Sequence, residues 1–297
     1  MKIFIVILNW NQAKLTLECV ESVLKLKKEK NQQVEIVVVD NGSEEPIEGH
    51  KGTTILRTGK NLGFAGGNNF GIRYSLDNLA DYVMILNNDT VVDSNLLVNL
   101  IETIEKDKTV GIVSPKIYFA KGYEFNKEKY KKNELGKVIW YAGGKIDWRN
   151  VYGINVGVDE VDRGQFEKPK EIDFATGACF LVKAKALKEV GLFDEKYFMY
   201  KEDEDLAMRM KKKGWKLVYD PKAKLWHKVA QSSGIGSDLN DYFISRNRLL
   251  FGFKYASFRT KLALFRESVK LFIFGRHWQA VGIRDYYLRK FGKGSWR

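Results

Sequence analysis

The sequence predicts an α/β protein built on a largely parallel sheet, and three observations lead to this class. Short apolar, β-prone runs recur through most of the chain, and segments with helical spacing separate them. Several of these runs end abruptly in polar residues, as strands buried on both faces of a parallel sheet do. The 297 residues have an ordinary hydrophobic content of 44%, so they can bury such a core. One large domain, or one domain with an appendage, is therefore expected.

The first quarter of the chain has a β-α-β rhythm. Lys2–Leu8 is the first expected strand, because Asn9-Trp10-Asn11 ends the apolar run too early for a signal peptide. A helix follows, with apolar residues at helical spacing from Leu15 onward. The second and third strands are expected at Val34–Val39 and Thr53–Arg57. Parallel strands joined by right-handed crossovers follow from this order.

A glycine-rich segment, Asn61–Gly71, should open a helix that runs to about Leu79. It is not G-x-G-x-x-G and does not follow the first strand, which counts against a dinucleotide-binding site. Tyr82–Leu86 is the next expected strand, and it ends in Asn87-Asn88-Asp89. Ligands of open α/β sheets lie just past such strand ends. An acid there can hold a divalent cation, although a plain turn is the alternative.

The middle of the chain continues the alternation of helix and strand. A helix is expected over Ser94–Lys106 with Ser94 as its N-cap, followed by a strand at Val110–Pro115. A charged surface insertion is expected at Tyr118–Lys137 and a hairpin at Val138–Val156.

The last elements of the expected domain surround an acidic run. A turn over Asp173–Ala178 should lead into a buried strand, and a short helix should cover Ala184–Val190. Glu202-Asp203-Glu204-Asp205 should open a helix that ends near Lys213, with Gly214 just past its end. Strands are then expected at Lys216–Tyr219 and Ala223–His227.

Basic residues are concentrated at the C-terminal end. The formal net charge is +13, and the segment from Phe251 to Arg297 holds eleven basic and two acidic residues. This excess implies an anionic partner: phospholipid, anionic glycan or nucleic acid. No recognition motif accompanies the charge, so we expect no nucleic acid.

The same segment is expected to form two or three helices. Leu262, Phe265, Val269 and Phe272-Ile273 have helical spacing, with Arg and Lys between them. Basic amphipathic helices of this kind lie on anionic membranes. A helical cap on the first domain or a homodimer interface is the alternative. We place a first domain at residues 1–237 and a C-terminal helical, basic amphipathic extension at residues 238–297.

Two cysteines, Cys19 and Cys179, are too few for a disulfide framework or a structural zinc site. We expect both to be reduced, which indicates the cytosolic side of a membrane. No apolar run approaches the roughly 20 residues of a spanning helix. The expected location is cytoplasmic and peripheral, at the inner face of the cell membrane.

Seven motifs follow one another between Lys2 and Arg248: Asn9-Trp10-Asn11, Val39-Asp40-Asn41-Gly42-Ser43, Gly63-Phe64-Ala65-Gly66-Gly67-Asn68-Asn69, Leu86-Asn87-Asn88-Asp89, Thr176-Gly177-Ala178, Glu202-Asp203-Glu204-Asp205 and Trp226-His227. Read together, they resemble family 2 glycosyltransferases, and most closely the rhamnosyltransferase-like branch. The resemblance implies a GT-A fold, Rossmann-like, with a mixed, mostly parallel central sheet. It also implies a nucleotide-sugar donor and inversion at the anomeric carbon.

The resemblance places a donor site at the ends of the first strands. Asp40 matches the position that reads the base, and a carboxylate there can accept the imide N–H of uracil or thymine. An Asx-turn is the alternative for Asp40, and helix–sheet packing is the alternative for the glycines. The other expected donor-site residues are Asn9, Asn11, Asn41, Asn61, Gly66, Asn68, Asn87 and Asn88.

Asp89 is the expected metal ligand, and His227 is the expected second ligand. The family pattern Asp-x-Asp is Asn87-Asn88-Asp89 here, so one carboxylate is missing and weak affinity is expected. The metal would be Mg²⁺ or Mn²⁺, and an imidazole slightly favours Mn²⁺. A structural histidine at a strand end is the alternative.

Asp203 matches the second residue of the family's Glu-Asp motif and is the expected catalytic base, with Glu202 orienting the acceptor. An inverting transfer needs a carboxylate that takes the acceptor proton, and repulsion among neighbouring acids can raise a pKa. An ordinary acid-rich helix start is the alternative. Ser232–Gly236 is expected to close over the diphosphate, and Arg246 to reach phosphate or pair with an acid. The acceptor and sugar site is expected at Thr176, Gly177 and Ala178.

The expected function is transfer of L-rhamnose from dTDP-β-L-rhamnose to a saccharide or lipid-linked saccharide in cell-surface polysaccharide synthesis. A UDP-sugar donor (galactose, galactofuranose or GlcNAc) is the alternative within the family. A sugar-1-phosphate nucleotidyltransferase is disfavoured, because it should carry glycine, Arg and Lys where this chain has Asn9-Trp10-Asn11-Gln12. A non-catalytic membrane- or glycan-binding protein on the same scaffold is left open by the missing carboxylate.

Overall fold

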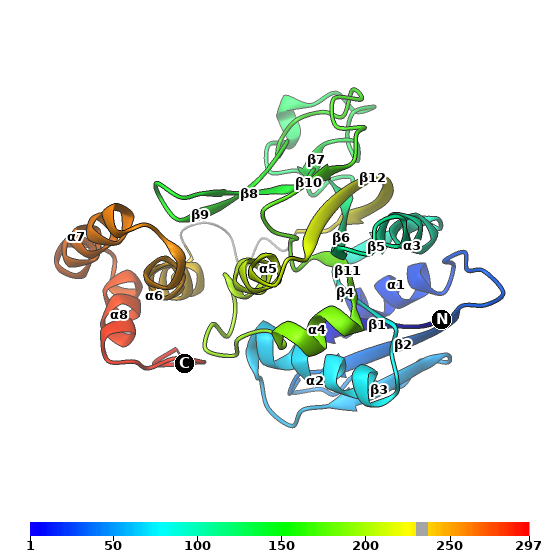
Figure 1. Ribbon diagram of the computed structural model, residues 1–297, viewed down its shortest axis with the longest axis horizontal. Coiled ribbons are helices and arrows are strands. Elements are labelled where there is room, and N and C mark those ends of the chain that lie inside the picture. The colour runs from blue at the N-terminus through cyan, green and yellow to red at the C-terminus, as the bar shows by residue number, and fades with distance from the viewer. Residues whose placement is uncertain (230–236, 297) are drawn as a thin grey trace.

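The computed structural model describes residues 1–229 and 237–296, and its centre is one mixed sheet flanked by helices (Figure 1). The strands lie in the spatial order β10 (Lys170–Glu171), β12 (Lys216–His227), β6 (Val110–Phe119), β11 (Cys179–Lys183), β4 (Tyr82–Asn87), β1 (Lys2–Asn9), β2 (Gln33–Asp40) and β3 (Thr53–Arg57). The strands β3, β2, β1 and β4 run parallel, whereas β11 is antiparallel to both of its neighbours. The predicted α/β class with a mixed central sheet is confirmed.

Smaller strands extend this sheet at one side. β5 (Thr90–Val92) pairs with β12, and β7 (Ile139–Tyr141) pairs with β6. A separate hairpin is formed by β8 (Gly144–Asp147) and β9 (Tyr152–Asn155).

Helices cover both faces of the sheet (Figure 1). One face carries α1 (Ala13–Val23) and α3 (Leu96–Lys106), and the other carries α2 (Gly63–Asp77), α4 (Ala184–Val190) and α5 (Glu202–Lys212). Three further helices pack together at the left of Figure 1: α6 (Asp238–Tyr255), α7 (Phe258–Phe274) and α8 (His277–Tyr287). In that view α6 lies between α5 and the other two, so it joins the C-terminal helices to the sheet domain.

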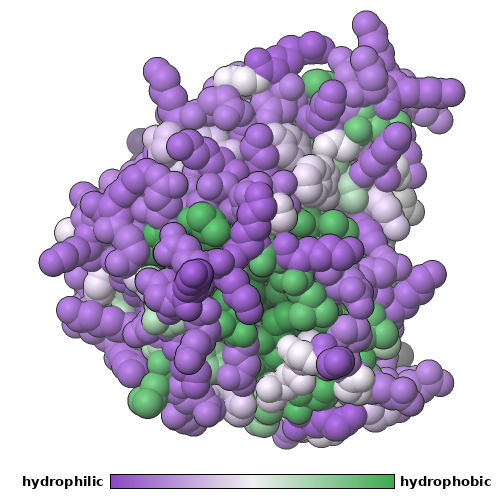
Figure 2. Space-filling model, turned by 90° about the vertical axis from the view of Figure 1, so that its right-hand side faces the viewer, coloured by the Kyte–Doolittle hydropathy of each residue, from purple (hydrophilic) through white to green (hydrophobic). Residues whose placement is uncertain are grey.

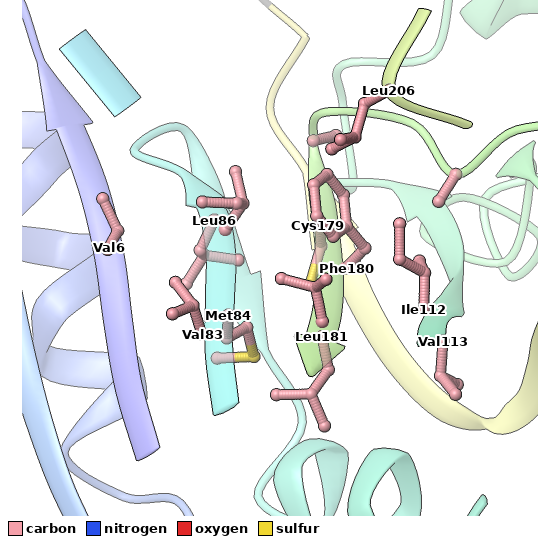
Figure 3. Close-up of a cluster of buried hydrophobic side chains, with 14 of the residues drawn as sticks. Val6, Val83, Met84, Leu86, Ile112, Val113, Cys179, Phe180, Leu181 and Leu206 are labelled. Carbon is pink, nitrogen blue, oxygen red and sulfur yellow. The ribbon is translucent and has the colours of Figure 1, made fainter. Parts of the chain in front are cut away.

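The core forms where strands are buried on both faces. Residues Tyr82 to Leu86 of β4 are buried, as their apolar run predicts. Figure 3 shows side chains of β4 beside those of β11: Val83, Met84, Leu86, Cys179, Phe180 and Leu181. Both cysteines are buried and free, and burial raises the pKa of the Cys19 thiol to about 12, so this thiol is inert at neutral pH.

The predicted N-cap of α3 is wrong. The helix begins at Leu96, and the side chain that organises its start belongs to Asp93 rather than to Ser94. The Asp93 carboxylate accepts the backbone N–H of Asn95 at 2.8 Å, and the Asp93 carbonyl accepts that of Leu96 at 3.0 Å. A short acid two residues earlier therefore replaces the expected hydroxyl cap.

Three predicted strand boundaries are also wrong, because pairing partners far along the chain decide them. The strand expected at Val110–Pro115 continues to Phe119, into the predicted insertion, since β7 and β12 pair with its far half. The hairpin predicted over Val138–Val156 is present as β8 and β9, but its start is wrong, because the preceding β7 pairs with β6. The two strands expected over Lys216–His227 are one strand with an irregularity between Asp220 and Lys224.

The surface differs between the two ends of the molecule. The face at the right of Figure 1 is mostly hydrophilic, with apolar side chains gathered in a hollow below its centre (Figure 2). The helix with many exposed large apolar side chains is α7, at the opposite end. Within residues 1–229 and 237–296, no helix is long and apolar enough to cross a bilayer.

Candidate active site

The polar ends of several strands meet at one edge of the sheet. The parallel register places Asn9 of β1 opposite Asp40 of β2, and Asn87 ends β4 beside them. β11 is antiparallel to β4 and begins at this edge, and β12 ends there beside β5. Ligands of open α/β sheets bind past such strand ends. The predicted donor, metal and sugar-site residues are therefore brought together.

The Asp40 carboxylate is buried and holds the loop that follows β2. Its oxygens accept the backbone N–H groups of Ser43 at 3.3 Å and Ile47 at 3.1 Å. Asn9 is fully buried, and its Nδ2 lies 3.4 Å from Asp40 Oδ1 and 3.2 Å from the Ser43 hydroxyl. These N–H groups lie three and seven residues after Asp40, so the bonds differ from the Asx-turn considered for it, which would use the N–H two residues on. Base recognition by Asp40 stays a prediction.

Asn11 joins the loops that follow β1 and β2. Its backbone is left-handed, with φ 52°, its Oδ1 accepts the N–H of Glu44 at 2.8 Å, and its own N–H donates to the Ser43 hydroxyl at 2.9 Å. Asn11 also lines a pocket of about 320 Å³ together with Ala13, Glu44 and Glu45. A pocket of this size at the strand ends suits part of a nucleotide.

Asn41 draws the start of α2 against the sheet. Its Nδ2 donates to Asn61 Oδ1 and to the Gly63 carbonyl, both at 3.1 Å. Asn61 Oδ1 also accepts the Gly63 N–H at 2.8 Å, at the first turn of the helix. A Cβ on Gly67 would strike Leu8 and Asn41. Close helix–sheet packing, the alternative considered for the glycines, therefore accounts for Gly67.

Asn68 lies buried in the first turns of α2 with a free acceptor. Its Nδ2 donates to the Phe64 carbonyl at 3.0 Å, whereas its Oδ1 is buried without a hydrogen-bond partner among the described residues. A buried acceptor without a donor costs about 1–3 kcal/mol, so this oxygen is available to a ligand. Gly66, two residues earlier on the chain, packs against Leu62, where a Cβ would approach to 2.8 Å.

Asp89 and His227 are in direct contact although 138 residues separate them. His227 Nε2 lies 2.9 Å from Asp89 Oδ1, and both side chains are buried. Neighbouring ligand atoms on one octahedral ion with bonds of about 2.1 Å lie roughly 3 Å apart, so the pair fits a divalent cation. His227 Nδ1 is buried without a hydrogen-bond partner in the described part of the chain. No group of three or more metal-ligating His, Cys, Asp or Glu side chains occurs in the described ranges.

Asn87 and Asn88 connect the end of β4 to its surroundings. Asn88 Nδ2 donates to the Thr16 hydroxyl at 3.0 Å and to Gln12 Oε1 at 3.2 Å. The Asn87 N–H donates to the Ala178 carbonyl at 2.9 Å. Their predicted contacts with the donor are not tested by these bonds.

Three of the four acids at the start of α5 have raised pKa values. Burial is the main cause: it raises the pKa of Glu202 well above its ordinary value, and it raises the pKa of Asp203 and of Glu204. The charge of Asp203 adds to the rise for Glu202, whereas the N–H groups of Gly177 and Glu204 oppose the rise in the pKa of Asp203. The expected direction is right, but desolvation outweighs the repulsion that the sequence suggested.

Asp205 behaves differently from these three acids. Burial alone would raise its pKa, but Lys254 and Arg209 bring the pKa below the ordinary value. Its oxygens meet Lys254 Nζ and Arg209 Nε, each at 2.7 Å, and the Tyr255 hydroxyl at 2.9 Å. Asp205 therefore fastens α5 to α6 rather than facing a substrate.

Asp203 and Glu202 form a pair with unequal proton affinity. Asp203 is half-buried, and its oxygens accept the N–H groups of Gly177 at 3.0 Å and Glu204 at 2.8 Å. These bonds favour its ionised form. Glu202 is buried, and its Oε2 has no hydrogen-bond partner among the described residues. Two adjacent carboxyl groups with different environments can divide acid and base tasks between them.

The segment from Thr176 to Ala178 links the strand end that precedes Asp89 with Asp203. The Ala178 carbonyl accepts the N–H of Asn87, two residues before Asp89, and the adjoining Gly177 N–H donates to Asp203. Thr176 is buried beside them. A Cβ on Gly177 would lie 2.8 Å from the Phe64 ring, so the segment also touches the start of α2.

Sequence reasoning missed the turn that precedes α5. Phe198, Tyr200 and Lys201 have left-handed backbones, with φ of 65°, 65° and 75°. Such conformations cost about 1–3 kcal/mol each outside glycine. Asn247 of α6 holds this turn, because its Nδ2 donates to the carbonyls of Tyr197 (2.8 Å), Met199 (2.7 Å) and Tyr200 (3.0 Å). Asn247 was visible in the sequence only as one asparagine within a helical segment after His227. No motif or spacing marked it as a partner of this turn.

The prediction for Arg246 is wrong. This side chain is fully buried, and its guanidinium donates to the carbonyls of Lys196 at 3.3 Å and Tyr197 at 3.0 Å. Burial lowers the pKa of Arg246, and the residue anchors the same turn as Asn247 instead of reaching phosphate or pairing with an acid. The expected closing loop, Ser232–Gly236, lies outside the described residues.

Comparisons with known proteins agree with this arrangement. The chain matches the model of glycosyl transferase family 2 over residues 4–191 and that of glycosyl transferase family group 2 over residues 152–291. The low-salt glycan biosynthesis hexosyltransferase Agl10 of Haloferax volcanii is 28% identical over 182 residues, 60% of this chain and 53% of that protein. The N-acetylglucosaminyl-diphospho-decaprenol L-rhamnosyltransferase of Mycobacterium tuberculosis is 27% identical over 215 residues, 68% of each chain. The poly-beta-1,6-N-acetyl-D-glucosamine synthase of Staphylococcus aureus is 25% identical over 76% of this chain and 49% of that protein.

The chain thus spans about half the length of two of these relatives and about two thirds of the third. Among solved structures, GalNAc-T7 with UDP, GalNAc and Mn²⁺ has a TM-score of 0.61 at 18% identity, over 90% of this chain and 54% of that one. The mannosyltransferase PcManGT from Pyrobaculum calidifontis, in complex with GDP-Man and Mn²⁺, has a TM-score of 0.53 at 13% identity, over 97% and 74%. At these identities the likeness concerns the fold, and it confirms the predicted GT-A fold.

Proposed function

The chain belongs to glycosyl transferase family 2, and from this premise we propose that it moves a sugar from a nucleotide diphosphate to an acceptor hydroxyl, with inversion at the anomeric carbon. One observation carries the proposal. A hydrogen-bonded path runs from Asn87 through Ala178 and Gly177 to Asp203. It fixes a half-buried carboxylate next to the strand ends that carry the Asp89–His227 pair. This transfer requires a catalytic base close to the position that binds the diphosphate.

Asp203 takes the proton of the acceptor hydroxyl in this proposal. The hydroxyl oxygen forms the new bond to the anomeric carbon while the bond from that carbon to the diphosphate oxygen breaks, and its electron pair leaves with the nucleotide diphosphate. A pKa raised by burial makes Asp203 a stronger base than a surface aspartate. Glu202, whose pKa is raised well above its ordinary value by burial and by the charge of Asp203, orients the acceptor through its free Oε2.

Asp89 and His227 are the residues that would hold Mn²⁺ or Mg²⁺. A cation bound there would supply positive charge to the leaving diphosphate. The contact at 2.9 Å and the burial of both side chains support this assignment, as do the Mn²⁺ ions in both similar structures. Asn87 stands where a second carboxylate would add charge, so the affinity is weak in this proposal.

We propose dTDP-β-L-rhamnose as the donor and a saccharide or lipid-linked saccharide as the acceptor. The similarity to an N-acetylglucosaminyl-diphospho-decaprenol L-rhamnosyltransferase, two thirds of which the chain covers, supports this choice. The similarity to a poly-beta-1,6-N-acetyl-D-glucosamine synthase favours a second candidate, a UDP-sugar donor. In either case the pyrimidine would enter the pocket beside Asn11, near Asp40.

Residues 1–237 form the catalytic domain in this proposal, and residues 238–297 form the helical extension. The boundary coincides with the start of α6 at Asp238. Asn247 and Arg246 on α6 bind the turn before α5, so the first helix of the extension serves the catalytic domain directly.

A thermal-shift panel of dTDP, UDP and GDP, each with Mn²⁺, Mg²⁺ or EDTA, tests the proposal. A ligand at 100 times its Kd adds roughly 2.7 kcal/mol to the free energy of unfolding. We expect stabilisation by a pyrimidine diphosphate only with metal, lost in Asp89→Ala and kept in the control Asp77→Ala, whose side chain is exposed on α2. No shift with dTDP or UDP under any condition would contradict the proposal.

A further inference from the structure

The outer side of α7 carries a continuous row of exposed apolar side chains. Their exposed fractions run from 44% for Val269 to 84% for Phe258. At 100° per residue the row falls within about 100° of the helix circumference. Single apolar side chains on a surface are ordinary, but a contiguous row marks an interaction site. The row is Phe258, Leu262, Phe265, Val269, Phe272 and Ile273.

Contacts on the opposite side of α7 fix this orientation. Leu264 and Ser268 are buried, and the Ser268 hydroxyl lies 2.7 Å from the Tyr287 hydroxyl. Glu267, the single acid of α7, accepts two hydrogen bonds from Arg248 of α6, each at 2.8 Å. Rotation of the apolar row into the protein would break these contacts, so the row faces outward.

Basic side chains border the apolar row. On the helical projection Arg259, Arg266 and Lys270 lie along one edge of the row, and Lys261 lies at the other. None of these four forms an ion pair within the described ranges, whereas Arg276 of the next turn pairs with Asp241. The outward side of α7 is therefore apolar with unpaired positive charge and no acid.

We propose that this side of α7 docks on an anionic lipid surface. The apolar row would enter the boundary between headgroups and acyl chains, and the basic side chains would meet the phosphates. A second copy of the chain is a poorer occupant, because a two-fold interface through this row would bring the same cations together. The biological role of this docking rests on the proposed function, because a lipid-linked acceptor would be held in such a surface.

Side-chain hydrogen bonds of α6 connect α7 with the turn before the candidate site. Arg248 joins α7 to α6, and Asn247, the residue before it on α6, binds the turn that precedes Asp203. In Figure 1, α6 stands between α7 and α5. Docking through α7 would therefore hold the candidate site at a fixed distance from the lipid surface.

Co-sedimentation of the whole chain with vesicles tests the proposal. We expect binding to vesicles of phosphatidylglycerol and phosphatidylcholine, weaker binding to phosphatidylcholine alone, and a decrease as salt increases. The triple variant Leu262→Gln, Phe265→Gln, Ile273→Gln should bind roughly tenfold more weakly or worse. The triple variant Arg259→Gln, Arg266→Gln, Lys270→Gln should lose roughly a hundredfold on anionic vesicles, about fivefold per charge.

Matched variants elsewhere serve as controls. Lys127→Gln, Lys131→Gln, Lys132→Gln removes three exposed charges, and Leu24→Gln, Leu79→Gln removes exposed apolar side chains. Both should bind vesicles as the unchanged chain does. Wild-type-like binding by the α7 variants would overturn the proposal, as would absence of vesicle binding, or a dimer in light scattering that the apolar variant dissociates. The nucleotide thermal shifts need no lipid, so failure here is separate from failure of the transfer proposal.

Discussion

Replacement of Asn247 by alanine should weaken both the fold and the reaction. Its Nδ2 serves three carbonyls of the turn that leads into α5, at 2.7–3.0 Å. The amide nitrogen has only two hydrogens, which the three carbonyls share. Each hydrogen bond contributes about 1 kcal/mol net, and carbonyls left without donors cost more. The expected loss is roughly 3 kcal/mol in the free energy of unfolding, or a fall of roughly 6–12 °C in Tm.

The reaction should suffer because the turn positions Asp203. Phe198, Tyr200 and Lys201 keep left-handed backbones only while their surroundings enforce them. A displacement of about 1 Å at a catalytic group costs roughly a hundredfold in rate. We therefore expect kcat to fall about a hundredfold at a temperature where the variant is folded. The donor KM should change little, because the proposed donor pocket lies at the ends of β1 and β2.

Two further variants make this prediction specific. Asn247→Asp keeps the shape but removes the donors, so it should be at least as harmful as alanine. Asn99→Ala removes a side chain whose Nδ2 donates to one exposed carbonyl, that of Lys222, and should change stability by less than about 1 kcal/mol without affecting kcat. Urea denaturation and steady-state kinetics measure both effects. An Asn247→Asp variant as stable and active as the unchanged chain would refute the hydrogen-bond reasoning.

Two other predictions concern the candidate site itself. Asp89→Asn and His227→Ala should each weaken Mn²⁺ binding roughly tenfold or more, measured by metal titration of the thermal shift with dTDP or UDP, and unchanged affinity would remove the metal assignment. Glu202→Gln should become more stable relative to the unchanged chain as pH rises above 4.5. The folded pKa of Glu202 lies above its ordinary value of 4.5, so in that range the native state binds more protons than the unfolded chain and its stability falls with pH. Urea denaturation at pH 4.5 and pH 7.5 measures this, and a stability difference that does not vary with pH would count against the raised pKa.

The bounds of helices and strands could be predicted from the sequence where neighbouring residues determine them. The strand at Thr53–Arg57 and the helix at Ala184–Val190 have the predicted bounds, and the helix from Glu202 ends before Gly214, whose φ is 84°. The GT-A fold followed from seven motifs in order rather than from periodicity. The motifs also predicted that Asp89 and His227 lie close together. No local pattern in the sequence could predict this contact.

Features that depend on contacts between residues far apart in the chain could not be predicted from the sequence. The extension of β6 to Phe119 depends on pairing with β7 and β12, and the continuity of β12 depends on β6. The left-handed turn at Phe198–Lys201 contains no glycine, so its shape follows from Asn247 and Arg246 rather than from its own residues. The raised pKa values were attributed to repulsion because burial is not visible in a run of four acids.

Transfer by the Asp203→Asn variant tests the central claim most directly. Asparagine keeps the size of the side chain and removes the base, so metal-dependent stabilisation by the nucleotide should persist while kcat falls roughly a thousandfold. Glu204→Gln is the matched comparison, because the Glu204 carboxylate is engaged by Lys201 Nζ at 2.8 Å and 3.0 Å, and it should retain most of its turnover at a temperature where it is folded. Near-normal turnover by Asp203→Asn would contradict the account.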